Sequence, residues 1–287
     1  MANAKPLINA DSQPLSDQRI EIPSGSLSLA AKLTVLSPCA PMLILAHGFA
    51  GDMDENGLFV EARDFFAGMG FSVLRFDFRG CGASDGDFRK VGLKDLACDL
   101  SSVVKYVRSQ ADLRPTAIGM VCFSLAAGVA ILANTSRIGA YAFWSPAVYT
   151  DRDMVPRYRS REVLEQVARR GWFMKAGQRV AGAFIEELAS RQIEDAIAHF
   201  RHPVFLVHGS DDQRIPSASS QKLVRHLAPT SRLILIPGAD HSFRSNSQNR
   251  EWVFTATATW LNKRLGKSKS TSEQTQMFSA IERGCEH

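Results

Sequence analysis

The residue with the clearest chemical potential in this sequence is Ser124, which lies between two apolar runs. The first run covers 116–121 and the second covers 125–133, and no Pro, Asn or Asp between them would form an ordinary loop. A strand that passes almost directly into a helix holds such a hydroxyl at the edge of a sheet. The start of the helix adds free N–H groups and partial positive charge. Ser124 is therefore a candidate nucleophile, and the alternative role for it is that of a simple helix cap.

A serine nucleophile needs a base that accepts its proton and an acid that orients the base, and two later stretches contain such residues. The stretch 208–216 follows an apolar run and includes the acidic pair Asp211 and Asp212. The stretch 238–243 follows another apolar run and includes His241. Residues that follow parallel strands lie at one edge of the sheet, so both stretches can meet the serine. Spacing favours Asp212 as the acid, and Asp211 is the alternative.

Apolar strands that alternate with amphipathic helices are predicted to position these residues. The run 42–46 is apolar throughout, as is typical of a strand with both faces covered. Apolar residues with helical spacing predict a helix over 93–109. Further strands are predicted at 71–78, 116–121, 138–144, 204–208 and 233–236, further helices at 58–69, 125–133, 217–227 and 248–265, and a hairpin at 19–22 and 27–36. This alternation indicates an α/β fold with a doubly wound, mostly parallel sheet.

Residues 149–195 interrupt the alternation, because they form helix-like patches rich in Arg, Glu and aromatic residues without a clear β-strand. We expect this segment to be a small, mainly helical cap above the carboxyl ends of the strands, where ligands bind in such sheets. The whole is predicted to be a single domain over 19–265. The polar ends 1–18 and 266–287 are predicted to be flexible tails.

Composition argues against several classes of function. The net charge of +5, from 34 basic and 29 acidic residues, is spread along the chain, so we expect no nucleic-acid partner. The apolar runs are shorter than the roughly 18–20 residues that span a membrane, and no signal-peptide pattern is visible. Five cysteines show neither a Cys-x-x-Cys pair nor zinc-like spacing. We therefore expect a cytoplasmic protein without metal or cofactor, and the oligomeric state stays open.

Five motifs in a fixed order make the sequence resemble the α/β-hydrolase superfamily over about residues 27–265. They are His47-Gly48-Phe49, the segment Phe76 to Gly86, the turn around Ser124, His208-Gly209-x-x-Asp212 and Gly238-x-x-His241. The order nucleophile, acid, histidine is that of the superfamily. Within it, the segments 47–51 and 238–243 and the modest cap are most similar to bacterial esterases of the cinnamoyl/feruloyl type.

The resemblance implies a role for each matching residue. Ser124 would attack an acyl carbon, His241 would take up and return the proton, and Asp212 would hold the imidazole in place. The backbone N–H groups of Phe49 and Leu125 would form the oxyanion hole. The implied activity is hydrolysis of a small-molecule carboxylic ester through an acyl-enzyme, with no cofactor.

The turn departs from the usual Gly-x-Ser-x-Gly pattern, because Cys122 and Ala126 replace the two glycines. Both side chains are small, so the turn stays possible. Similar replacements occur in bacterial acyltransferase and thioesterase relatives, so acyl-thioester chemistry is one alternative. A non-catalytic binding module on the same fold is another. Cys122 itself lies two residues before the bend and is expected to point into the core.

Other polar residues of these motifs are expected to have structural roles. His47 would brace the loop after the first core strand, and Asp77, Arg79 and Ser84 would form a hydrogen-bond network around a Gly-rich turn. His208 would hydrogen-bond locally. The basic residues of the cap are expected to form a solvated face, and the alternative is a preference for acidic or carrier-bound acyl groups. The cap aromatics that form either an acyl pocket or a cap core are Tyr149, Tyr158, Trp172, Phe173 and Phe184.

Overall fold

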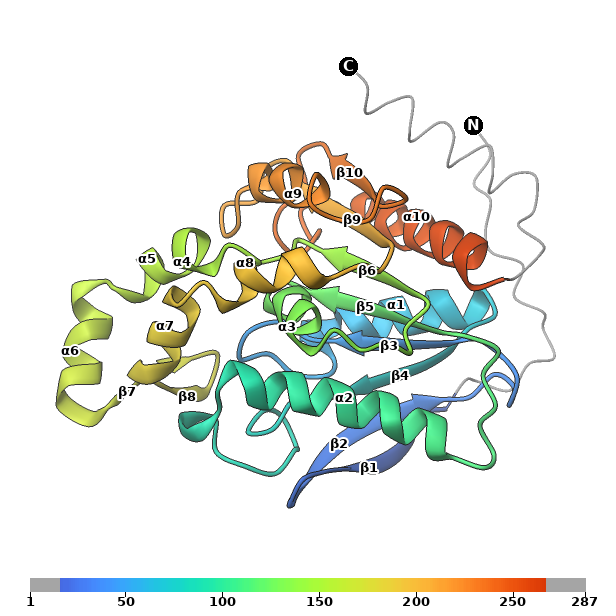
Figure 1. Ribbon diagram of the computed structural model, residues 1–287, viewed down its shortest axis with the longest axis horizontal. Coiled ribbons are helices and arrows are strands. Elements are labelled where there is room, and N and C mark those ends of the chain that lie inside the picture. The colour runs from blue at the N-terminus through green and yellow to red at the C-terminus, as the bar shows by residue number, and fades with distance from the viewer. Residues whose placement is uncertain (1–15, 267–287) are drawn as a thin grey trace.

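The computed structural model describes residues 16–266, and these are organised around an eight-stranded sheet (Figure 1). The strand order is β1-β2-β4-β3-β5-β6-β9-β10. The pairs β1–β2 and β2–β4 are antiparallel, and every other pair is parallel. The strands are β1 (Gln18–Ser24), β2 (Leu27–Thr34), β3 (Met42–Ala46), β4 (Ser72–Phe76), β5 (Ile118–Phe123), β6 (Ala140–Trp144), β9 (Val204–Gly209) and β10 (Arg232–Ile236). The predicted mostly parallel, doubly wound sheet is confirmed.

Helices cover both faces of the sheet, and each face has its own buried apolar layer. One face carries α1 (Leu58–Gly68) and α10 (Ser247–Leu265). The opposite face carries α2 (Leu93–Ser109), α3 (Leu125–Ala133) and α9 (Ser217–Val224). All residues of the central strands β3, β5 and β6 are buried. Since both faces of these strands pack against helices, their sequences are apolar without alternation.

The predicted and observed boundaries of β5 differ in a way that affects the position of Ser124. The prediction ended this strand at 121, whereas it runs to Phe123 and is followed directly by Ser124. The helices α2 and α3 have the predicted bounds. The chain therefore passes from strand to helix through a single residue, as the apolar runs on either side predicted.

A separate group of short elements lies between β6 and β9, at one end of the sheet (Figure 1). We call residues 149–195 the cap region. Its elements are α4 (Thr150–Asp153), α5 (Val155–Tyr158), α6 (Arg161–Arg170), β7 (Trp172–Lys175), β8 (Gln178–Ala181), α7 (Gly182–Ala189) and α8 (Gln192–Ala196), of which α8 ends one residue beyond this range. The expectation that this segment lacks a strand was wrong, because β7 and β8 form an antiparallel hairpin. Each strand has only four residues. The residues at positive φ in the turn are Ala176 and Gly177, and Ala-Gly is a weaker sequence signal for a hairpin than Asn-Gly or Asp-Gly.

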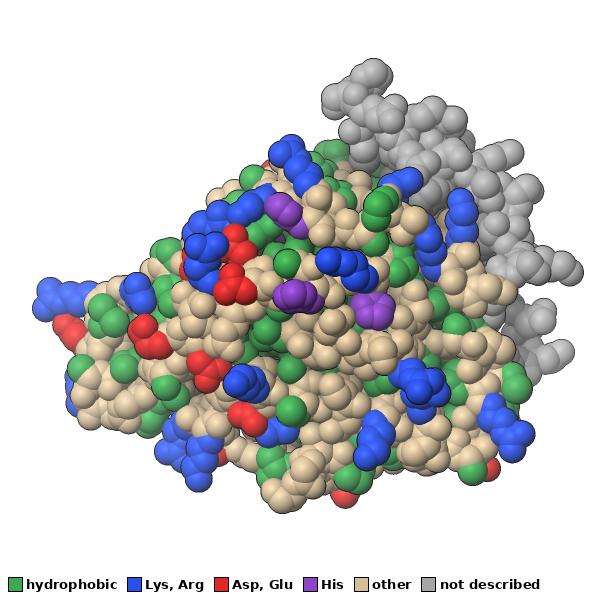
Figure 2. All heavy atoms as spheres, viewed as in Figure 1, with side chains coloured by type: hydrophobic (Ala, Val, Ile, Leu, Met, Phe, Trp, Pro, Cys, Tyr) green, Lys and Arg blue, Asp and Glu red, His purple; other side chains and the backbone are tan. Residues whose placement is uncertain are grey.

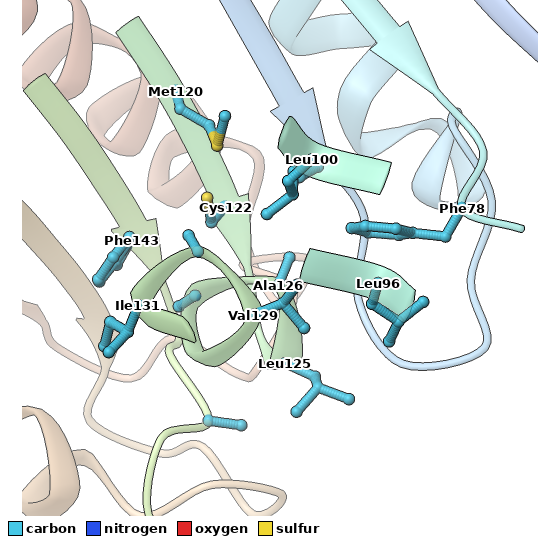
Figure 3. Packing of buried hydrophobic residues seen from close by; sticks show 14 of the residues in the cluster. Phe78, Leu96, Leu100, Met120, Cys122, Leu125, Ala126, Val129, Ile131 and Phe143 are labelled. Atoms are coloured by element: carbon cyan, nitrogen blue, oxygen red, sulfur yellow. The ribbon is translucent and has the colours of Figure 1, made fainter. Parts of the chain in front are cut away.

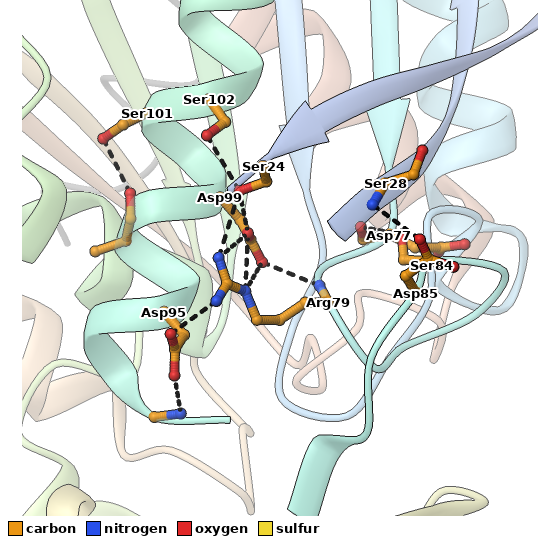
Figure 4. A network of polar contacts seen from close by, with 12 residues as sticks. Ser24, Ser28, Asp77, Arg79, Ser84, Asp85, Asp95, Asp99, Ser101 and Ser102 are labelled. Carbon is orange, nitrogen blue, oxygen red and sulfur yellow. Dashed lines mark hydrogen bonds and ion pairs between the residues drawn. The ribbon is translucent and has the colours of Figure 1, made fainter. Parts of the chain in front are cut away.

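The predicted network around the Gly-rich turn is present and links three elements (Figure 4). The Arg79 side chain contacts Asp99 and Asp95 of α2, at 2.7 Å in each case, and Ser24 of β1 donates to Asp99. The carboxylate of Asp77 accepts hydrogen bonds from the backbone N–H groups of Ala83 in the Gly-rich turn and of Met53 in the loop after β3. The Asp99 side chain is fully buried, so the guanidinium is its compensating charge.

The predicted tails 1–18 and 266–287 lie almost wholly outside the described residues. The exceptions are residues 16–18 and Gly266. Of these, Gln18 begins β1, Asp17 accepts hydrogen bonds from Thr34 and Arg63, and Gly266 caps α10. Over residues 16–266, none of the helices combines the length and the apolar character that crossing a bilayer requires.

Candidate active site

Ser124 occupies a strained turn between β5 and α3. Its φ of 54° and ψ of −120° lie in a region that L-residues rarely adopt. The backbone holds it there, because its N–H donates to the Trp144 carbonyl at 2.9 Å. Its own carbonyl accepts from the N–H groups of Ala127 and Ala147, at 3.2 and 3.0 Å. The neighbouring strand β6 and the chain that follows it therefore stabilise the turn.

The two residues that replace the usual glycines are buried beside this turn. Figure 3 shows Cys122 pointing from β5 into the same apolar layer as Met120, while Ala126 lies on α3 in that layer. Burial raises the pKa of the Cys122 thiol well above its ordinary value, which favours the unreactive neutral form. The expectation that Cys122 points into the core is confirmed.

A chain of hydrogen bonds joins three of the predicted residues. The Oγ atom of Ser124 lies 3.1 Å from Nε2 of His241, and Nδ1 of His241 lies 2.7 Å from Oδ2 of Asp212. The alternative acid Asp211 is exposed, and its carboxylate instead accepts from the Ser210 hydroxyl. With an ionised carboxylate as acceptor, Nδ1 carries the proton and Nε2 is free to accept one from the serine.

The carboxylate of Asp212 accepts hydrogen bonds at both of its oxygens. Oδ1 accepts from the N–H groups of Arg214 and Ile215, at 2.8 and 2.9 Å. Oδ2 lies 3.0 Å from Nε2 of His208, in addition to its contact with His241. Although burial opposes it, hydrogen bonds from His208 and His241 hold the pKa of Asp212 well below its ordinary value. This residue is therefore an ionised, firmly oriented partner for the imidazole.

His208 is a second buried imidazole behind the first. Its Nε2 lies 3.0 Å from both Asp212 Oδ2 and the Ile215 carbonyl, and its Nδ1 lies 2.7 Å from the Ser220 hydroxyl. Because both neighbours of Nε2 are acceptors, Nε2 carries the proton and the Ser220 hydroxyl donates to Nδ1. The local hydrogen-bonding role predicted for His208 is confirmed, but sequence reasoning missed that its partner is the candidate acid. The four-residue spacing from Asp212 did not indicate this contact, because such a spacing brings side chains together in a helix, whereas His208 lies in β9 and Asp212 in the loop after it.

The surroundings of His241 lower the pKa of its imidazole. Burial lowers its pKa, and the nearby positive charge of Arg214 acts in the same direction, whereas the Asp212 carboxylate opposes both. The net pKa lies below the ordinary value for histidine, so the ring is mainly neutral at neutral pH. A neutral imidazole is the form that can accept the proton of a hydroxyl.

The loops that carry Asp212 and His241 approach each other closely. A Cβ atom at Gly209 would lie 2.1 Å from the carbonyl oxygen of Ala239, so only glycine fits at the end of β9. The N–H of Asp211 donates to that same carbonyl at 3.1 Å. On the other side, the Ser145 hydroxyl donates to the carbonyl of His241 at 2.8 Å. These contacts fix the distance between acid and base.

The predicted oxyanion donors are the N–H groups of Phe49 and Leu125. Leu125 is the first residue of α3, where an N–H has no acceptor inside the helix. The loop that carries Phe49 lies against Ser124, since a Cβ atom at Gly48 would be 3.3 Å from Cβ of Ser124. Within residues 16–266, neither N–H donates to a protein acceptor. Both groups are therefore available to a substrate oxygen.

Two side chains brace the loop that precedes Phe49. His47 donates from Nδ1 to the Gly48 carbonyl, and its Nε2 accepts from the N–H of Phe78, at 2.9 and 3.1 Å. The carboxylate of Glu55 accepts from the N–H of Gly48 at 2.9 Å, and burial raises the pKa of this carboxyl. The bracing role predicted for His47 agrees with these contacts. Glu55 was missed, because nothing in the local sequence distinguishes it from a surface acid.

Ser124 and His241 open onto a cavity of about 260 Å³ between the sheet edge and the cap region. The ring of Phe49 stacks on Phe184 at 5.2 Å and meets Tyr158 edge-on at 5.4 Å between ring centroids. Tyr158 lines the cavity, whereas Phe173 and Phe184 are buried in the apolar layer that also covers the α2 and α3 face of the sheet. Five charged side chains also line the cavity, namely Glu55, Asp153, Arg157, Lys175 and Arg214. In the described part of the chain, no group of three His, Cys, Asp or Glu side chains is arranged to hold a metal ion.

Comparison with known proteins finds one family and several similar structures. A model of the alpha/beta hydrolase family matches residues 43–256. The uncharacterized protein YfhR of Escherichia coli K12 is 30% identical over 200 residues, which cover 69% of this chain and 62% of that protein. The match therefore spans less than two thirds of that relative.

Among the solved structures with a similar fold, two match over almost their whole length. One is Est1E from Butyrivibrio proteoclasticus with bound ferulic acid, which has a TM-score of 0.70 at 23% identity and covers 86% of this chain and 100% of that chain. The other is the Pyrococcus furiosus esterase Pf2001, which has a TM-score of 0.70 at 21% identity and covers 88% of this chain and 92% of that chain. At these identities the likeness is one of fold.

Proposed function

This chain belongs to the α/β-hydrolase family, and on that premise we propose that it is a serine hydrolase that cleaves a small-molecule carboxylic ester. The observation that carries the proposal is the hydrogen-bond chain from Ser124 through His241 to Asp212, with the serine at the wall of a cavity. The esterase names of similar folds are consistent with this reaction. Fold alone does not specify chemistry, so the proposal rests on the geometry of the side chains.

In the proposed reaction, His241 takes the hydroxyl proton as Ser124 attacks the carbonyl carbon of the ester. The resulting tetrahedral intermediate collapses, and the imidazolium returns the proton to the departing alcohol. The acyl group then remains as an ester of Ser124. A water molecule, deprotonated by the same imidazole, attacks this acyl-enzyme and releases the carboxylic acid. Asp212 stays ionised throughout and stabilises the imidazolium.

The developing negative charge on the carbonyl oxygen is assigned to the N–H groups of Phe49 and Leu125. Each such donor contributes about 3–4 kcal/mol to transition-state stabilisation in enzymes where it has been removed. The strained turn supports this assignment, because it directs the serine toward the start of α3. The loop at Gly48 brings the second donor against the serine.

The two alternatives from the sequence differ in what they require. Cys122 and Ala126 were the only support for a non-catalytic binding module, and they are accommodated without loss of the strained turn. Acyl-thioester chemistry would use the same residues with a thiol as leaving group. If kcat/KM is higher for an acyl thioester than for the oxygen ester of the same acyl group, the protein is an acyl-thioesterase or acyltransferase instead of an ester hydrolase.

The direct test is turnover of 4-nitrophenyl butyrate by the full chain and by its Ser124→Ala variant. Removing the nucleophile is expected to lower kcat by about ten-thousandfold or more. The matched control is Ser101→Ala, which removes an exposed hydroxyl on α2 and should keep full activity. Circular dichroism checks that both variants are folded. Unchanged turnover in folded Ser124→Ala would overturn the proposed mechanism.

A further inference from the structure

Three basic side chains from separate parts of the fold converge on the cavity of the proposed active site. Arg157 comes from α5, Lys175 ends β7, and Arg214 lies in the loop that follows β9. They are far apart in the sequence, so their proximity is a product of the tertiary structure. The cap region supplies two of them and the catalytic loop supplies the third.

None of the three cations is neutralised by an ion pair with a carboxylate in residues 16–266. The Arg157 guanidinium donates to the carbonyl of Gln213, which is an uncharged partner. Burial lowers the pKa of Lys175, and the positive charges of Arg214 and Arg157 lower it further. Like charges held this close repel one another, so the free protein retains unbalanced positive charge here.

The acidic residues of the same cavity have other partners. The carboxylate of Asp153 accepts from the Ser219 hydroxyl at 2.6 Å; burial raises the pKa of this carboxyl, whereas that hydrogen bond and the charge of Arg152 oppose the shift. Glu55 accepts from the N–H of Gly48, and the charges that act on it are those of His47, Asp52 and Arg244. Neither carboxylate therefore forms an ion pair with any of the three cations. With all five side chains ionised, the lining carries one net positive charge.

We propose that Arg157, Lys175 and Arg214 form a subsite that binds a carboxylate of the ester substrate, so that the preferred substrates are esters with a free carboxylate near the scissile bond. The inference rests on the proposed function, because it places this subsite beside the nucleophile. Guanidinium groups form paired hydrogen bonds with a carboxylate, and a lysine adds a third donor. One net positive charge matches a single negative charge better than a phosphate dianion.

The test compares pairs of esters that differ only in this charge. In the first pair, the mono-4-nitrophenyl ester of adipic acid is compared with the same ester ending in a primary amide, so that the carboxylate lies on the acyl side. In the second pair, the acetyl ester of 3-hydroxyphenylacetic acid is compared with its amide, so that the carboxylate lies on the leaving group. Rates measured with Ser124→Ala are subtracted as background.

The wild-type chain is expected to prefer the carboxylate ester of at least one pair by about tenfold or more in kcat/KM. Lys175→Gln and Arg157→Gln should each bring the ratio of carboxylate to amide ester toward one, and Lys175→Glu should reverse the preference. The ratio is the readout because both esters of a pair use the same nucleophile and base. Changes in the catalytic residues therefore cancel.

Arg169→Gln is the matched control, since it removes an exposed arginine of α6 that does not line the cavity. This variant should keep the wild-type ratio. A wild-type ratio near one for both pairs, or a ratio that survives the Lys175 and Arg157 substitutions, would overturn the subsite while ester hydrolysis itself stands. If wild-type protein hydrolyses none of the four esters above the Ser124→Ala background, the proposed function fails and the subsite fails with it.

Discussion

Asp212 is the residue on which the orientation of the candidate base depends most directly. Its carboxylate accepts hydrogen bonds from two backbone N–H groups and from the imidazoles of His208 and His241. Each carboxylate oxygen therefore has two partners. An amide in its place presents a donor where the imidazole needs an acceptor, and this favours the wrong tautomer of His241. The neighbouring Asp211 is exposed and has no contact with the imidazole.

We predict that Asp212→Asn lowers kcat for 4-nitrophenyl butyrate by about a thousandfold to ten-thousandfold, because loss of the orienting acid has an effect of this size in Ser-His-Asp triads. The isosteric change Asp211→Asn is the control and should alter kcat by less than about threefold, since exposed groups contribute little. Steady-state kinetics of the two variants decide between the acids. A larger loss in Asp211→Asn would reassign the acid to that residue.

The three residues of the hydrogen-bond chain, Ser124, His241 and Asp212, could be predicted from the sequence because each follows an apolar run that is recognisable as a strand. Parallel strands end at one edge, so Ser124, Asp212 and His241 were expected to meet before any distance was known. Lys175 and Arg157 could not be placed in the same way. They lie in short cap elements without a periodic apolar pattern, and only the tertiary fold brings them to the cavity.

At the scale of elements, the contact between Arg79 and Asp99 joins the chain after β4 to helix α2 (Figure 4). The Asp99 carboxylate is fully buried and also accepts from the Ser24 hydroxyl. Taking away one partner of a buried pair leaves an uncompensated charge in the interior, which costs more than the pair contributes when intact. The network therefore ties three elements together through one guanidinium.

We predict that Arg79→Met lowers the free energy of unfolding by about 3–5 kcal/mol, because it leaves the Asp99 charge buried and unpaired. The double variant Arg79→Met/Asp99→Asn should recover part of that loss, since the amide keeps hydrogen bonds but carries no charge. Denaturant unfolding followed by circular dichroism measures both. A double variant that is less stable than Arg79→Met alone would contradict this account of the network.

Prediction at the level of elements succeeded where burial on both faces imposes an apolar sequence. The strands β3 and β6 and the helix α3 were recognised for this reason, whereas α2 was recognised from the helical spacing of its apolar residues. The hairpin of β7 and β8 was missed, because each strand is short and only partly buried. Short strands are stabilised by their tertiary neighbours more than by their own sequence.

At the scale of the whole molecule, the sheet and the cap region contribute different residues to the proposed active site. The sheet edge supplies the nucleophile, the base, the acid and the oxyanion donors, whereas the cap region supplies Arg157, Lys175 and Tyr158 to the cavity wall. Basic and acidic side chains are interspersed over the cap in Figure 2, so no extended basic surface covers this face. Arg157, Lys175 and Arg214 line the cavity, where they can act on a bound substrate.

The measurement that tests the central claim most directly is covalent labelling of the full chain with a fluorophosphonate probe, followed by mass spectrometry of the modified peptide. The claim that His241 activates Ser124 predicts rapid labelling at Ser124 that is lost in His241→Ala, although that variant stays folded. Labelling at another residue, such as Cys122, or no labelling of folded wild-type protein would contradict it.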